Sequence, residues 1–166
     1  MKKITFLILC LIFYSCSKES TEKFSIDPLK PVEVGLSSLT KKSLSHYDFD
    51  IYIINHKPVS GMQFELNPSN IFTIDSVSVL RERLSKDDDF SIHNNESGTI
   101  LMFSMTGKKI KESESNIKIN NTLLKVYMHQ KNESITLPDS IWLKSIIADE
   151  KGQKIESNSI PYHLGK

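Results

Sequence analysis

Carboxylates and imidazoles are the side chains of this sequence that could bind a metal ion or transfer protons. The most acidic run is Asp87-Asp88-Asp89. Calcium loops alternate their ligands with spacers and use glycine to turn sharply, whereas three consecutive side chains point in different directions, as in a solvated loop. No two histidines have metal-ligand spacing, and each lies near an expected turn or strand edge: His46, His56, His93, His129 and His163. We therefore expect surface histidines and no metal site.

The sequence contains no recognisable constellation for covalent or acid–base catalysis. It lacks the Gly-x-Ser-x-Gly elbow that exposes a serine nucleophile. Glu65 lies on an expected strand, but nothing in the sequence places a second carboxylate beside it, as glycoside hydrolysis requires. We expect no catalytic residues, no cofactor and no enzymatic activity.

Two aromatic residues are candidates for a binding surface. Trp142 begins an alternating strand and shares its face with Lys144, while the opposite face of that strand is apolar. Tyr52 lies on the polar face of another alternating strand. Exposed rings at these positions could bind a sugar or a protein, and the alternative for Trp142 is to cover the edge of the core.

The overall composition is that of an ordinary globular chain. With 166 residues, 39% of them hydrophobic and 25% charged, the sequence fits one domain with a small extension. A net charge of +1 provides no basic field for binding nucleic acid. Two cysteines cannot form a disulfide framework or a cysteine-rich zinc site.

The N-terminus has the form of an export signal. Lys2 and Lys3 precede an almost wholly apolar stretch, residues 4–14, which is shorter than the ~20 residues that a membrane-spanning helix needs. Phe13-Tyr14-Ser15-Cys16 follows as a lipobox, and the chain then becomes polar. This arrangement resembles the signal of a bacterial lipoprotein of the Bacteroidetes type. The resemblance implies removal of residues 1–15 and lipidation of Cys16; the alternative is a plain secretory signal cut near residue 15.

Residues 16–31 are expected to form a lipidated N-terminus and a flexible tether, because they are polar and end with Pro28 and Pro31. Loss of Lys2 and Lys3 leaves 19 basic against 20 acidic residues, a net charge of −1. Residue 17 is not the aspartate that retains enterobacterial lipoproteins in the inner membrane. We therefore expect an envelope location, at the outer membrane rather than the inner one, with periplasmic and surface orientations both open.

Residues 32–163 show the pattern of many short strands separated by turns. The alternation of apolar and polar residues is clearest over 47–53, and the continuous apolar run 99–105 indicates burial on both faces or a central place in a sheet. Two further stretches, 71–80 and 117–128, each predict a pair of strands. We count about nine strands and no helix of ordinary length, which predicts an all-β sandwich.

Four short motifs follow one another in this region. They are Val32-Glu33-Val34-Gly35, Gly61-Met62-Gln63-Phe64-Glu65-Leu66, Gly98 to Ile110 followed by Leu123-Leu124-Lys125-Val126, and Ala148 to Ile155. In this order and spacing they resemble a cohesin domain, of the cohesin and carbohydrate-binding jelly-roll superfamily, over about residues 32–163. The resemblance implies a nine-stranded jelly-roll sandwich, one face of which binds a dockerin, a small calcium-loaded helical module. Together with the lipoprotein signal, it predicts a non-catalytic, lipid-anchored module that binds a protein partner. A polysaccharide bound through Trp142 and Tyr52 is one alternative, and an envelope protein whose sandwich only joins an assembly is another.

Two serines lie in motifs for modification. Asp75-Ser76-Val77 and Asp139-Ser140-Ile141 resemble the O-glycosylation motif of exported Bacteroidetes proteins. The resemblance makes Ser76 and Ser140 candidate glycosylation sites.

Overall fold

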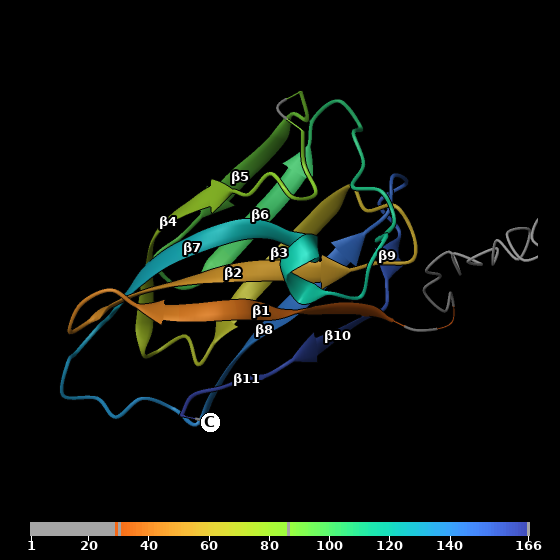
Figure 1. The fold of residues 1–166 in the computed structure, drawn as a ribbon. Helices are drawn as coiled ribbons and strands as arrows, with labels where there is room; N and C mark the ends of the chain where they lie inside the picture. The colour runs from red at the N-terminus through yellow and green to blue at the C-terminus, as the bar shows by residue number, and fades with distance from the viewer. Residues whose placement is uncertain (1–28, 30, 86, 166) are drawn as a thin grey trace, which may run out of the picture.

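The computed structural model describes residues 29, 31–85 and 87–165, which form a sandwich of two β-sheets (Figure 1). This confirms the predicted all-β sandwich. The described residues contain eleven strands and one short 3-10 helix. The predicted signal peptide, the predicted lipidation site Cys16 and most of the predicted tether lie outside the described residues.

The first sheet has the strand order β10-β1-β2-β7-β4. Its neighbouring strands are antiparallel except β1 and β10, which run parallel. Its members are β1 (Val32–Lys41), β2 (His46–Ile54), β4 (Phe72–Val79), β7 (Thr122–Gln130) and β10 (Ser157–Ile160). The 3-10 helix η1 (Lys118–Asn121) leads directly into β7.

The second sheet has the order β11-β8-β3-β6-β5, and β9 also pairs with β8. These strands are antiparallel. Its members are β3 (Gly61–Asn67), β5 (Phe90–Asn94), β6 (Thr99–Ser104), β8 (Ser140–Ala148), β9 (Lys154–Ile155) and β11 (Tyr162–His163).

The core lies between the two sheets and follows the period-two alternation of the strands. β2 contributes Phe49 and Ile51, and β3 contributes Phe64, all three completely buried. Alternate residues of these strands point to the outer faces. The sheets are therefore held together by apolar burial, while their outer faces are free to differ in chemistry.

Several elements differ from the sequence-based expectation. The stretch 71–80 contains a single strand, β4, whose register shifts between Ile74 and Ser76, because a bulge absorbs the expected bend. Residues 117–128 form η1 and part of β7 rather than two strands. β6 lies between β3 and β5 as a central strand but is buried on one face only, since Leu101 is 39% exposed.

Candidate functional site

The outer face of the second sheet exposes large apolar side chains from two strands. On β8, Trp142 is 37% exposed and Ile146 is 52% exposed. On β6, Leu101 is exposed to a similar extent and Phe103 is half-buried. Because β3 separates β8 from β6, these side chains lie on one continuous face. Clustered apolar exposure of this kind is typical of an interaction surface.

Strand register arranges this face in rows across the sheet. One row runs from Ala148 on β8 through Gly61 on β3 to Phe103 on β6. The next row runs from Ile146 through Gln63 to Leu101. The apolar members of the two rows therefore surround Gly61, which has no side chain.

These rows enclose a shallow apolar hollow of about 380 Å³. A Cβ atom placed on Gly61 would lie 4.0 Å from the Cβ atoms of Ala148 and Phe103, an ordinary contact distance. The backbone of Gly61 therefore forms an uncovered floor that an incoming apolar side chain could reach. The lining residues are Gly61, Met62, Gln63, Leu101, Phe103, Ile146 and Ala148. We call this feature the Gly61 hollow.

Polar residues border the Gly61 hollow along β3. Glu65 lies opposite Lys144 of β8 on one side and Thr99 of β6 on the other. Gln63 Nε2 donates a hydrogen bond to Glu65 Oε1 at 3.3 Å. An apolar centre with a polar border is the usual anatomy of a protein–protein interface.

Of the three residues predicted for a binding surface, the structure exposes two and buries one. Trp142 and Lys144 are both exposed on this face, which decides between the two alternatives left open for Trp142. Tyr52 is completely buried, so its predicted exposure is wrong. Leu101 and Ile146 were missed as surface residues, although the regular burial of every second residue on β6 and β8 is the signal that reveals them.

Tyr52 is buried because η1 and the side chain of Glu33 cover its ring on the outer face of the first sheet. Its hydroxyl donates a 2.7 Å hydrogen bond to Glu33 Oε1, and Lys118 Nζ lies 5.3 Å from the ring centroid. Burial, followed by the hydrogen bond to Glu33, raises the pKa of Tyr52 far above its ordinary value. The ring packs over Gly35, where any Cβ would lie 2.9 Å from the tyrosine oxygen. Tyr52 therefore stabilises the sheet and is not available to a ligand.

Charged side chains are also present on this outer face, whereas the centre of the outer face of the second sheet is apolar. Lys125 Nζ lies 2.6 Å from Asp50 Oδ1, which raises the pKa of Lys125. Lys42 Nζ lies 3.2 Å from an oxygen of Asp48, a carboxylate that is only 6% exposed. The two faces of the sandwich thus present different chemistry to a partner.

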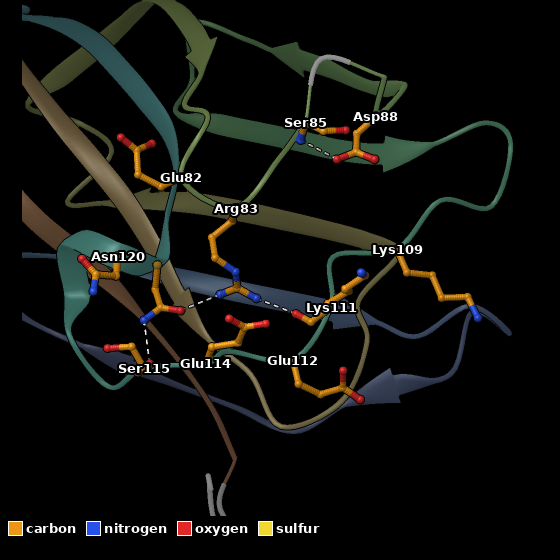
Figure 2. Close-up of a pocket in the computed structure, with 11 residues that line it drawn as sticks. Glu82, Arg83, Ser85, Asp88, Lys109, Lys111, Glu112, Glu114, Ser115 and Asn120 are labelled. Carbon is orange, nitrogen blue, oxygen red and sulfur yellow. Dashed lines mark hydrogen bonds between the residues drawn. The ribbon is translucent and has the colours of Figure 1, made fainter. Parts of the chain in front are cut away.

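A polar cavity of about 610 Å³ lies at one end of the sandwich, and Arg83 extends into it (Figure 2). The guanidinium donates hydrogen bonds to Asn121 Oδ1 at 2.6 Å, Ser113 Oγ at 2.7 Å and Asn55 Oδ1 at 3.0 Å. It also donates to the carbonyl oxygens of Ile53 and Lys111. Because the protein itself supplies these acceptors, Arg83 connects the end of β2, the segment before η1 and η1 itself, and its guanidinium is not free to bind a substrate.

Partial burial lowers the pKa of Arg83, and the nearby carboxylates Glu114 and Glu112 oppose that shift. Two aspartates of the run that follows β4, Asp88 and Asp89, accept hydrogen bonds from different segments of the chain. Asp88 accepts from the Ser85 amide at 2.6 Å, and Asp89 accepts from the Ser104 hydroxyl at 2.9 Å. Hydrogen bonds to Thr106 and to Ser104 lower the pKa of Asp89.

Three other features of the described chain bear on function. No group of three or more histidine, cysteine, aspartate or glutamate side chains is assembled within it as a metal site. Nor do its helices include one long and apolar enough to cross a membrane. Of the candidate modification sites, Ser76 is exposed on β4 and Ser140 is partly exposed at the start of β8.

Comparison with solved structures identifies similar sandwiches in cohesins. A complex of a CaDoc0917 variant with CaCohA2, a cohesin of Clostridium acetobutylicum, matches with a TM-score of 0.56 and 16% identity, covering 80% of this chain and 99% of that one. A non-cellulosomal cohesin of the archaeon Archaeoglobus fulgidus matches with a TM-score of 0.54 and 13% identity, over 82% and 93% of the two chains.

A type I cohesin–dockerin complex from Clostridium thermocellum matches with a TM-score of 0.53 and 13% identity, covering 81% of this chain and 99% of that one. No family model matches the sequence, and a search of curated proteins finds no match. At these identities the likeness concerns the fold. The protein has a cohesin-like fold, the jelly-roll sandwich that its four sequence motifs predict.

Proposed function

We propose that this chain is a non-catalytic module that binds a protein partner through the outer face of β8, β3, β6 and β5. The observation that carries this proposal is the Gly61 hollow, an uncovered apolar depression with a polar border on a cohesin-like sandwich. A solved structure with a similar fold is a complex between a cohesin and a dockerin. A dockerin-like helical module is accordingly the proposed partner.

The geometry of the face suits such a partner. A helix laid across the sheet can insert one apolar side chain above Gly61 and make further contacts with Ile146 and Leu101. Lys144 and Glu65 offer opposite charges at the border, which favour one orientation of the partner over another. A few such anchors usually supply most of the binding free energy of an interface.

We also propose that the module is attached to the cell envelope by a lipid on Cys16, at the outer membrane. The basic N-terminus, the short apolar stretch and the cysteine that follows support this proposal. Fatty-acid labelling in the native host tests it. The wild-type chain should take up label and partition with membranes, whereas Cys16→Ser should do neither; label retained by Cys16→Ser would refute the assignment.

Polysaccharide capture is the alternative, and the structure weakens one of its two supports. Of the two rings predicted for sugar binding, only Trp142 is exposed, because Tyr52 is enclosed by η1 and Glu33. Sugar-binding surfaces generally rely on more than one accessible ring stacked against the ligand.

A capture experiment from native envelope extract separates these functions. The full chain serves as bait, with and without calcium chelation, and the same chain is run on polysaccharide affinity gels. A specific protein that is captured by wild type and lost after chelation supports a dockerin-like partner, since the calcium then belongs to that partner. A mobility shift on polysaccharide without protein capture refutes the proposed function.

Two variants locate the binding surface. Ile146→Asp introduces a charge beside the Gly61 hollow and should abolish capture. Ile119→Asp makes the same change at a residue that is 66% exposed on η1, outside that face, and should leave capture intact. Equal loss with both variants would contradict the proposed surface.

A further inference from the structure

Two histidines from distant parts of the chain face each other on the outer face of the first sheet. His46 on β2 lies directly opposite His129 on β7, and their ring centroids are 5.8 Å apart. The Gln130 amide donates to the Ser45 carbonyl at 2.8 Å, so that adjacent pair is the hydrogen-bonded one. His46 and His129 therefore form a non-hydrogen-bonded pair, in which facing side chains approach more closely.

Each imidazole contacts its polar neighbours through its Nδ1 atom. His129 Nδ1 lies 2.6 Å from Asp75 Oδ1 on β4. His46 Nδ1 lies 3.0 Å from Ser43 Oγ and 3.4 Å from Ser45 Oγ, in the connection between β1 and β2. Because the strands are ordered β2-β7-β4, Asp75 lies on the side of β7 that is away from β2. Nε2 is on a different edge of each ring from Nδ1 and is the second nitrogen through which each imidazole can ligate an ion.

We propose that His46 and His129 bind one divalent transition-metal ion, of the class of Zn²⁺ or Cu²⁺, through their Nε2 atoms. Water completes the coordination. With metal–nitrogen distances of ~2.0–2.1 Å and a tetrahedral angle, the two ring centroids would lie roughly 5.3 Å apart. The observed centroid separation of 5.8 Å is close to this distance.

The surroundings of the pair support ligation. A carboxylate that holds the second nitrogen of a histidine fixes its tautomer and orientation, as Asp75 does for His129. Both rings are accessible to solvent, so an ion can enter. Asp48, the next residue on this face of β2, contributes negative charge that Lys42 partly neutralises. Ions that prefer oxygen ligands, such as Mg²⁺, should not compete for a site of two imidazoles.

Isothermal titration of the full, untagged chain with ZnCl₂ and CuCl₂ tests the proposal, with MgCl₂ as the control ion. We expect one equivalent of Zn²⁺ or Cu²⁺ to bind, Cu²⁺ more tightly, and Mg²⁺ not to bind. His46→Ala and His129→Ala should each weaken binding at least tenfold. His93→Ala and His163→Ala, which remove exposed histidines of the second sheet, should leave it unchanged.

A second measurement examines Asp75 as a positioning residue. Long-range ¹H–¹⁵N spectra report the tautomer of His129, which Asp75→Asn should change, while Zn²⁺ binding weakens less than in His129→Ala. Thermal unfolding of each variant verifies that the sandwich is intact. The proposal is overturned if no saturable Zn²⁺ or Cu²⁺ binding occurs, or if the His46 and His129 variants bind as wild type does. Equal losses in the two control variants would overturn it as well.

Discussion

Replacing Arg83 by alanine should destabilise the sandwich by about 3 kcal/mol, more than most single surface changes. The guanidinium makes five hydrogen bonds, to β2 and the residue that follows it, to the segment before η1 and to η1 itself. Asn55 and Asn121, two of its partners, are at most 1% exposed. Hydrogen bonds to a charged group contribute about 1.5–3 kcal/mol each when they are counted singly.

The five contributions do not add, because several acceptors keep a second donor. Ser113 Oγ still accepts from the Asn55 amide, Asn55 Oδ1 still accepts from Ser113, and the Lys111 carbonyl still accepts from Asn55 Nδ2. Within the described chain, Asn121 Oδ1 accepts from Arg83 alone. One orphaned buried acceptor costs about 1–3 kcal/mol, and the lost charged hydrogen bonds bring the total to about 3 kcal/mol.

Urea unfolding followed by the fluorescence of Trp142, the single tryptophan, measures the effect. The midpoint should fall while the slope of the free energy with urea stays constant. Arg81→Ala is the matched control, because Arg81 is exposed and donates a single side-chain bond, to the Ser85 carbonyl; it should cost less than about 0.5 kcal/mol. A loss below about 1 kcal/mol for Arg83→Ala would refute the role given to this residue.

Three further results are expected. Tyr52→Phe should lower the free energy of unfolding by about 1 kcal/mol near neutral pH, and it should flatten the loss of stability above about pH 10. The folded state holds the Tyr52 proton more tightly than the unfolded state does, because burial raises the pKa of Tyr52. The free energy of unfolding of wild type therefore falls as the pH rises past the pKa of tyrosine in the unfolded chain. Urea titrations at about pH 9–11 measure this fall in wild type and in Tyr52→Phe. Gly35→Ala should cost about 1–3 kcal/mol by urea unfolding, because its Cβ would lie 2.9 Å from Tyr52 Oη and 3.1 Å from the Ile160 carbonyl oxygen; an unchanged midpoint would contradict that packing. Gly61→Ala should alter stability by less than about 1 kcal/mol, since its Cβ meets nothing closer than 4.0 Å, yet it should weaken partner capture by filling the hollow; full capture would place the anchor elsewhere.

The sequence predicts the sandwich because the side chains of a strand alternate between its two faces, and this alternation is visible in residues close together in the sequence. The alternation at 47–53 and 141–147 correctly assigns most inward and outward side chains, although it left both exposure and packing at the edge of the core open for Trp142. Strand count is harder, since β9 and β11 have only two residues each and carry no periodic signal. The bulge in β4 likewise depends on its pairing with β7 and not on local composition.

Which side chains are exposed on the outer faces of the sheets depends on contacts between segments that are far apart in sequence. The wrong prediction for Tyr52 has this cause. Tyr52 alternates as an outward residue, but η1 and Glu33 come from elsewhere in the chain and cover it. The hydrogen bonds of Arg83 and the pairing of His46 with His129 also join segments that are far apart in sequence. The apolar run containing Leu101 was ambiguous, because hydrophobicity alone cannot distinguish a doubly buried strand from one that presents an apolar face to a partner.

The position of β1 has a mechanical consequence. β1 lies between β2 and β10 and pairs with both, beginning at Val32 (Figure 1). Hydrogen bonds in such ladders lie across the strand direction, so tension applied at Val32 along the strand loads many of them at once in shear. A pull perpendicular to the strand would instead break them one after another. A module held at its N-terminal end while a partner pulls on the opposite sheet would resist force through this doubly paired strand.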